Sequence, residues 1–141
     1  MRALLVACAA LAATAAFAAD AGRHVDFTQG IVVDGVPVVD DFLCPFPVDP
    51  ATSRVTGPRP CQTTMTVGSF AYFSLRRPVQ GQSWADAIKR DDLAKAVRTA
   101  KDFPLLDDQL TTIETAMAPG APAGMLGAVA RIIDPKEPPG K

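Results

Sequence analysis

Three cysteines and a single histidine limit the chemistry that this chain of 141 residues could perform. Two of the cysteines, Cys44 and Cys61, enclose a proline-rich stretch. A redox-active pair usually has the spacing Cys-x-x-Cys, and a zinc site needs further cysteine or histidine ligands. Neither pattern is present. We therefore expect a structural disulfide between Cys44 and Cys61, and we predict no metal or cofactor site.

The predicted disulfide closes a segment whose composition does not favour regular structure. Prolines and a glycine in residues 45–60 exclude a helix or a central strand. Closing a loop of this length contributes about 3 kcal/mol in the chain-entropy model. Phe42, Phe46 and Val48 lie in or beside the loop, where exposed aromatic residues would form a partner-binding surface. The alternative is that these side chains cover the hydrophobic core.

Other reactive residues lack the partners that a catalytic mechanism requires. His24 is the only histidine, and we expect it to be a solvated imidazole and not a member of a catalytic triad. The serines lie in no nucleophile-elbow motif, and residues 120–127 lack the Gly-Lys-Ser/Thr ending of a phosphate loop. Adjacent aspartates occur where turns or helix caps are expected. These pairs are Asp40-Asp41, Asp91-Asp92 and Asp107-Asp108. We predict no catalytic residues.

The first nineteen residues have the composition of an export signal. Arg2 precedes an apolar stretch that is too short to span a bilayer, and Ala16-Phe17-Ala18 forms a small-x-small cleavage site. We expect residues 1–18 to be a signal peptide and the protein to be periplasmic or secreted. One alternative is a lipoprotein anchored through Cys8. Another is an alanine-rich helix of a cytoplasmic protein.

Composition without the leader restricts the partners. Roughly 120 residues remain, which suits one compact domain. Of fourteen basic and fifteen acidic residues, Arg2 leaves with the leader. A slightly acidic chain is a poor candidate for nonspecific nucleic-acid binding, so we expect no nucleic-acid partner. No later segment is as long as a transmembrane helix, and we expect no stable membrane insertion after cleavage.

Residues 27–134 are expected to form a single small α+β domain, after a flexible segment over 19–26 and before a disordered tail over 135–141. Residues 27–39 read as a β-hairpin whose Asp34-Gly35 dipeptide suits a type I′ turn. Residues 63–67 are β-prone and would add a strand after the disulfide loop. The predicted fold is an N-terminal β-hairpin or small sheet, a disulfide-closed proline-rich loop, and three or four α-helices.

The first two predicted helices lie in the middle of the chain. One begins near Thr66 or Ser69, although its aromatic run would also suit a strand. Ser83 is a plausible N-cap for the next, over residues 84–101. Its apolar residues lie on two opposite faces, with Trp84 and Ile88 on one of them. We therefore expect a helix that is covered on both sides, or one that breaks near Asp91-Asp92.

Two further helices are predicted in the last third. For the first, Asp107 or Asp108 is available as the N-cap, and Pro119-Gly120 ends it. Pro122 fits the first turn of the final helix. The apolar positions of the first are Leu106, Leu110, Ile113 and Met117, and those of the final helix are Met125, Leu126, Val129, Ile132 and Ile133.

Several short segments occur in an order that resembles a family of small, uncharacterised phage and prophage proteins. They are Phe27-Thr28, Asp34-Gly35-Val36-Pro37, Thr66-Val67-Gly68, Leu93-Ala94 and Ile133-Asp134. The resemblance covers most of residues 27–134 and implies a strand motif followed by three amphipathic helices. It implies no reaction. The leader and the Cys44 to Cys61 loop depart from the family's pattern, which a start assigned too far upstream would reconcile.

Two classes of function follow. The first is a small exported, non-catalytic binding or interaction module that presents the Cys44 to Cys61 loop to an unknown protein partner. The alternative is a phage-derived accessory or structural protein that acts by assembly. An enzyme ranks last, because no paired nucleophile and base, metal cluster or cofactor loop is present in the sequence.

Overall fold

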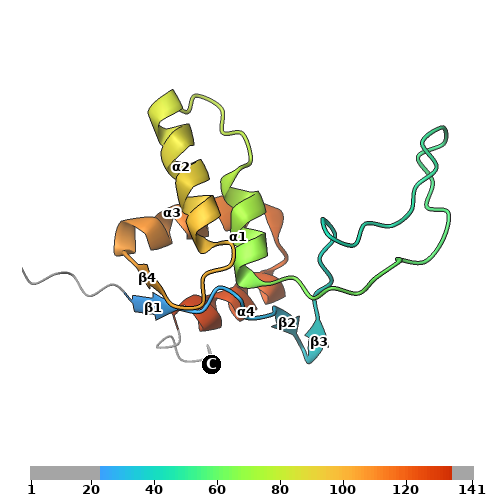
Figure 1. The fold of residues 1–141 in the computed structure, drawn as a ribbon, viewed down its shortest axis with the longest axis horizontal. Coiled ribbons are helices and arrows are strands. Elements are labelled where there is room, and N and C mark those ends of the chain that lie inside the picture. Colours follow the sequence, from blue (N-terminus) through green and yellow to red (C-terminus); the bar gives the residue numbers. More distant parts are fainter. Residues whose placement is uncertain (1–22, 135–141) are drawn as a thin grey trace, which may run out of the picture.

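The computed structural model describes residues 23–134, which form four α-helices, two antiparallel pairs of short strands and one long closed loop (Figure 1). The predicted α+β class is confirmed. The predicted signal peptide and C-terminal tail lie outside the described residues. The elements are β1 (Arg23–Val25), β2 (Val32–Val33), β3 (Val36–Pro37), α1 (Val67–Leu75), α2 (Trp84–Val97), β4 (Phe103–Leu105), α3 (Asp107–Met117), the 3-10 turn η1 (Ala118–Gly120) and α4 (Ala123–Ile133).

The predicted hairpin is confirmed as β2 and β3. Its turn is Asp34-Gly35, and both residues have positive φ, 50° and 80°, as a type I′ turn requires. Val33 pairs with Val36, and Val32 pairs with Pro37. The Val38 N–H still donates to the Ile31 carbonyl oxygen at 2.9 Å, but the Ile31 N–H donates to Met65, so the ladder ends after two residue pairs.

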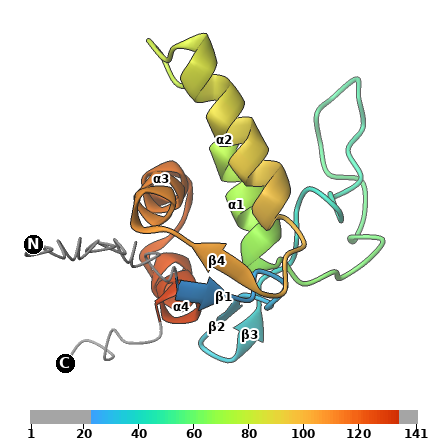
Figure 2. The same ribbon diagram turned by 60° about the vertical axis from the view of Figure 1, so that its left-hand side comes forward.

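A second strand pair, β1 with β4, was not predicted. Val25 lies opposite Phe103, and Val25 is buried in the core. Figure 2 shows the two strands side by side. A flexible segment was expected over residues 19–26, whereas the structure places residues 23–25 in a strand. The local composition of residues 23–25 does not predict a strand. This segment is extended because it pairs with β4, which lies about eighty residues later in the chain.

Side chains of β1 add polar contacts to distant parts of the fold. The Arg23 guanidinium donates to Asp134 Oδ2 at 2.6 Å and to Asp107 Oδ1 at 3.1 Å. The Asp134 carboxylate raises the pKa of Arg23. His24 Nδ1 lies 2.6 Å from Asp102 Oδ1, so this exposed imidazole has a carboxylate partner.

Helix α1 is the central element of the core. The Thr66 hydroxyl accepts from the Ser69 N–H at 3.1 Å, as expected for an N-cap. The predicted strand over residues 63–67 is reduced to single bridges, Thr64 with Val39 and Thr66 with Gly30. Gly68 is required by close packing, because a Cβ at this position would lie 2.7 Å from the Val97 carbonyl oxygen of α2.

Helix α2 is continuous and begins at the predicted cap, where Ser83 Oγ accepts from the Asp86 N–H at 3.1 Å. It does not break at Asp91, because the Asp91 carboxylate forms ion pairs with Lys95 and Arg76 and is not used as a cap. The alternative expectation, that other elements cover α2 on both of its faces, is also not met. Only Ala94 and Val97 are buried in this helix, and its N-terminal half extends away from the other helices (Figure 1).

The last two helices have the predicted apolar faces but different N-terminal contacts. The N-cap of α3 is Leu106, whose N–H donates to Gln109 Oε1 at 3.0 Å. Asp107 and Asp108 therefore occupy the first turn, where their charges favour the positive end of the helix dipole. The buried residues of α3 are Ile113 and Met117, and those of α4 are Met125, Val129 and Ile133.

Candidate functional site

The predicted disulfide joins Cys44 and Cys61, with their Cα atoms 5.5 Å apart. It lies near the base of a closed loop, residues 40–63, which we call the disulfide arm. The arm leaves the body between β3 and α1 and projects from it (Figure 1). Its two ends are joined by a hydrogen bond of 2.8 Å from the Asp40 N–H to the Thr63 carbonyl oxygen.

Asp40 fixes the start of the arm to the body. Its carboxylate is fully buried, and Oδ2 accepts from Ser69 Oγ of α1 at 2.7 Å. Oδ1 accepts from the N–H groups of Phe42 and Leu43, at 3.0 and 3.1 Å. A buried carboxylate is tolerated when hydrogen bonds compensate for its desolvation. The predicted turn role of Asp40-Asp41 is thus met, with an additional tie to α1.

Arg59 reinforces the arm next to the disulfide. Its guanidinium donates to the Cys44 carbonyl oxygen at 2.8 Å and forms an ion pair with Asp41. The same guanidinium lies 3.8 Å from the centroid of the Phe46 ring, in cation–π geometry. These contacts all lie within the arm, so the arm has an internal framework besides the disulfide.

The tip of the arm is a hydrogen-bonded turn. Asp49 Oδ1 accepts from the Ala51 N–H at 2.9 Å, and Oδ2 accepts from the Thr52 hydroxyl at 2.8 Å. These bonds lower the pKa of Asp49, because they favour its charged form. Val48 and Val55 form a single antiparallel bridge across the turn. Between the base and the tip, the Thr56 N–H donates to the Pro47 carbonyl oxygen at 2.9 Å, so the backbone is held at three places along the arm.

The three residues proposed for partner binding are each about half exposed: Phe42 by 53 %, Phe46 by 44 % and Val48 by 50 %. Phe42 lies at the base and stacks on Phe73 of α1, with ring centroids 3.8 Å apart. None of the three belongs to the buried core cluster. The alternative, that they cover the core, therefore fits Phe42 in part and does not account for Phe46 or Val48.

Two further apolar residues of the arm, Leu43 and Val55, are also more than half exposed. Val55 lies inside the same proline-rich stretch as Phe46 and Val48, and Leu43 directly precedes Cys44. Sequence reasoning missed them because it selected the aromatic residues and the one valine nearest to them. The arm carries a series of exposed apolar side chains on a fixed backbone.

Helix α2 carries a second apolar feature that was not expected. Trp84 is 88 % exposed and Ile88 is 60 % exposed, and both lie on the N-terminal half of the helix. Their helical spacing predicted a buried face. This spacing is ambiguous, because an exposed apolar face that binds another molecule has the same spacing as a face buried within the chain.

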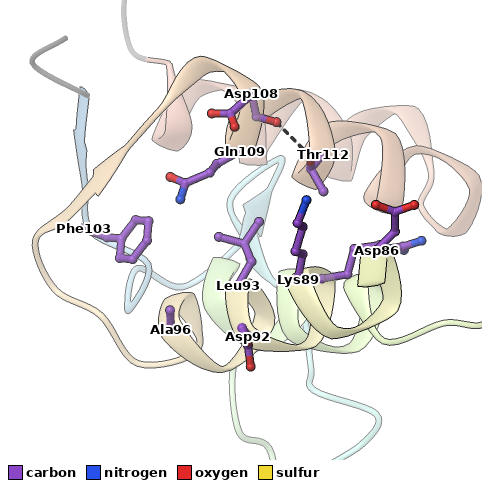
Figure 3. A pocket seen from close by; sticks show the side chains of 10 residues that line it. Asp86, Lys89, Asp92, Leu93, Ala96, Phe103, Asp108, Gln109 and Thr112 are labelled. Carbon is purple, nitrogen blue, oxygen red and sulfur yellow. Dashed lines mark hydrogen bonds between the residues drawn. The ribbon is translucent and has the colours of Figure 1, made fainter. Parts of the chain in front are cut away.

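A cleft of about 650 Å³ lies between α2 and α3 (Figure 3). Lys89 extends from α2 into this space, toward α3 and Thr112. The Thr112 hydroxyl is already engaged, because it donates to the Asp108 carbonyl oxygen at 2.8 Å. Acidic and basic groups line the cleft together, so their charges largely offset one another. They are Asp86, Asp92 and Asp108 with Lys89 and Arg90.

The aspartates and the histidine considered in the sequence analysis have structural partners: Asp40 is hydrogen-bonded to Ser69, and His24 lies beside Asp102. Lys95 lowers the pKa of Asp91 chiefly through a hydrogen bond, and the same bond raises the pKa of Lys95. The Thr28 hydroxyl and N–H lower the pKa of Asp26. Within residues 23–134, no group of three or more histidine, cysteine or acidic side chains is arranged to hold a metal ion.

Comparisons of the chain with protein-family models, with curated proteins and with solved structures find no match. The resemblance to small phage and prophage proteins therefore stays a prediction. None of the helices between residues 23 and 134 is long and apolar enough to cross a membrane.

Proposed function

We propose that the protein is a small exported interaction module that binds a protein partner through the disulfide arm. The observation that carries this proposal is the exposure of Phe46 and Val48 on a loop whose backbone is held at three separate places. Aromatic anchors dominate many protein interfaces, and a pre-organised loop loses little entropy on binding. The exposed side chains of Phe46 and Val48 add little to the stability of the isolated chain.

The proposal also includes the cellular compartment in which the protein acts. A disulfide forms and persists in an oxidising environment, which agrees with a cleaved signal peptide and with work in the periplasm or outside the cell. Lipidation at Cys8 would instead hold the same arm near a membrane surface. A misassigned start would place the protein in the cytoplasm.

Intact mass of the native protein from separated cell fractions tests the compartment. We expect a periplasmic or secreted species that begins at Ala19 and is two hydrogens lighter than its reduced form. A lipid-modified Cys8 would support the lipoprotein alternative. A cytoplasmic species with free thiols would overturn export.

Photo-crosslinking tests the arm. A photoreactive phenylalanine analogue replaces Phe46 or Val48 in the exported protein, and Val36 is the matched control because it is exposed, apolar and outside the arm. We expect one discrete protein adduct from positions 46 and 48 and none from position 36. Equal adducts from all three positions, or none from the arm, would contradict the proposal.

A second function is favoured by the exposed face of Trp84 and Ile88. In a phage-derived accessory or structural protein, this face would pack against another copy during assembly. The oligomeric state distinguishes the two proposals. A Trp84→Ser variant that converts an oligomer into monomers would favour assembly, whereas a monomeric wild-type chain would favour the interaction module.

A further inference from the structure

We infer that a site distinct from the arm binds a small organic oxyanion between the end of α1 and helix α3. A cleft of about 460 Å³ lies here, a volume within the range of small-molecule sites. Ser74 and Arg77 reach it from α1 and the segment after α1, Arg90 from α2 and Thr115 from α3. The inference is independent of the proposed arm function.

The charge of the cleft is the first reason. Arg77 and Arg90 line it, and no acidic residue does. Several arginines elsewhere have carboxylate partners, for example Arg23 with Asp134 and Arg59 with Asp41. Within the described part of the chain, neither Arg77 nor Arg90 forms an ion pair. Two guanidinium groups without a direct carboxylate partner therefore line this cleft, although Arg90 also lines the cleft between α2 and α3, where acidic residues are present.

The second reason is a pair of buried polar atoms. Ser74 is fully buried, yet its Oγ has no hydrogen-bond partner among residues 23–134, and neither does the buried Nε of Arg90. Buried polar groups nearly always have partners in native proteins, and leaving one unpaired costs stability. The two residues are in contact, because Arg90 Nη2 donates to the Ser74 backbone carbonyl oxygen at 3.5 Å. An oxyanion could accept hydrogen bonds from both.

The Arg77 guanidinium lies close to the connection after α3. A Cβ at Gly120 would collide with the Arg77 guanidinium, so glycine at this position lets the guanidinium lie against η1. Guanidinium groups bind carboxylates and phosphates with two parallel hydrogen bonds. Two of them beside a serine hydroxyl form a donor set that suits one oxyanion.

The rest of the lining gives the ligand class. Val79, Ala116, Pro78 and Pro119 supply an apolar wall next to the donors. A bare inorganic anion would leave this wall without a contact. The geometry points to a carboxylate or a phosphate monoester that carries an apolar group.

Calorimetric titration of the full oxidised chain tests the site with four probes: phenyl phosphate, phenylacetate, inorganic phosphate and the neutral 2-phenylethanol. We expect saturable binding of at least one aromatic anion, weaker binding of inorganic phosphate and none of the alcohol. Tighter binding of phenyl phosphate or of phenylacetate assigns the oxyanion as phosphate or carboxylate. Saturable binding of neither aromatic anion, or equal binding of the alcohol, would overturn the inference.

Point variants distinguish a loss of ligand binding at this cleft from a general effect of mutation on the protein. Arg90→Gln and Ser74→Ala should each weaken binding about tenfold, since a hydrogen bond to a charged group is lost. Lys89→Gln is the matched control, because Lys89 lies on the same helix and lines the other cleft. The melting temperature of Ser74→Ala should stay unchanged or rise, because the variant removes an unpaired hydroxyl. Unchanged affinity in Ser74→Ala and Arg90→Gln, or an equal loss in Lys89→Gln, would contradict the site. Phe46→Ser should leave the affinity unchanged, so failure here is distinct from failure of the arm proposal.

Discussion

Ser69 Oγ donates a hydrogen bond of 2.7 Å to Asp40 Oδ2, and both residues are buried although 29 positions separate them. This bond joins the first residue of the disulfide arm to the central helix α1. It makes the position of the arm depend on the core, while the internal contacts of Arg59 and Asp49 hold the arm's own shape.

Replacing Asp40 should destabilise the protein strongly. Asp40→Ala leaves Ser69 Oγ and two backbone N–H groups without their acceptor, and we expect a loss of about 3 kcal/mol in the free energy of unfolding. Asp41→Ala is the matched control, because its carboxylate is exposed and should contribute less than about 1 kcal/mol. Urea denaturation measures both. Equal losses in the two variants would contradict the anchoring role of Asp40.

Removing the disulfide should lower stability without removing the helices. The expected loss is about 3 kcal/mol, and no residue of α1 to α4 lies within the arm. Cys61→Ser is the cleaner variant, because Cys61 is exposed whereas Cys44 is buried. Thermal unfolding followed by circular dichroism gives both quantities. An unchanged melting temperature, or loss of the helical signal below the transition, would rule out this role.

Two glycine substitutions should have opposite signs. Gly68→Ala places a Cβ against the carbonyl oxygens of Val97 and Arg98, and we expect it to destabilise by about 2 kcal/mol. Gly127→Ala is the control in α4, where a Cβ would meet nothing within 4 Å. It should stabilise by about 0.5–1 kcal/mol through the better helix propensity of alanine. A stabilising Gly68→Ala would mean that α1 and α2 are farther apart.

Acid should weaken the fold through three carboxylates. The pKa values of Asp26, Asp49 and Asp91 lie below the ordinary 3.8 in the folded chain. Their contribution is therefore present above pH 3.8 and is lost as the pH falls through the lower folded values. Urea unfolding at a series of pH values should give a free energy that declines below about pH 4. The decline should be shallower in Asp49→Asn, and an identical slope would show that Asp49 contributes nothing.

Trp84 is the only tryptophan, which makes its environment measurable. Its high exposure predicts a fluorescence emission like that of solvated tryptophan, ready quenching by acrylamide and little change on unfolding. Trp84→Ala should change the stability by less than about 0.5 kcal/mol. A blue-shifted native emission that moves to the red on unfolding would show that a second copy or another segment covers this face.

Local signals predicted much of the fold. Asp34-Gly35 specified the hairpin turn, because both residues tolerate positive φ, and Ser83 specified the start of α2 through its hydroxyl. The pair of Cys44 and Cys61 specified the closed loop and therefore the arm. Each of these features depends on a few adjacent residues or on a simple count, so a single sequence is sufficient.

Features that depend on distant contacts were not predicted. The strand pair of β1 and β4 brings together short segments with weak propensity, one of which contains Pro104. The exposure of Trp84 could not be inferred, because residue spacing defines a face of a helix but not what packs on it. The oxyanion cleft was missed for the same reason. Ser74, Arg77 and Arg90 form a set only after the helices pack.

Competition for the photo-crosslink at position 46 tests the proposed arm function most directly. The adduct formed by the oxidised, exported chain should disappear when excess unlabelled wild-type protein is added. It should persist when the competitor is the double variant Phe46→Ser and Val48→Ser, provided that its circular dichroism and melting temperature match the wild type. Equal competition by the two proteins would contradict the claim that the exposed side chains of the disulfide arm bind the partner.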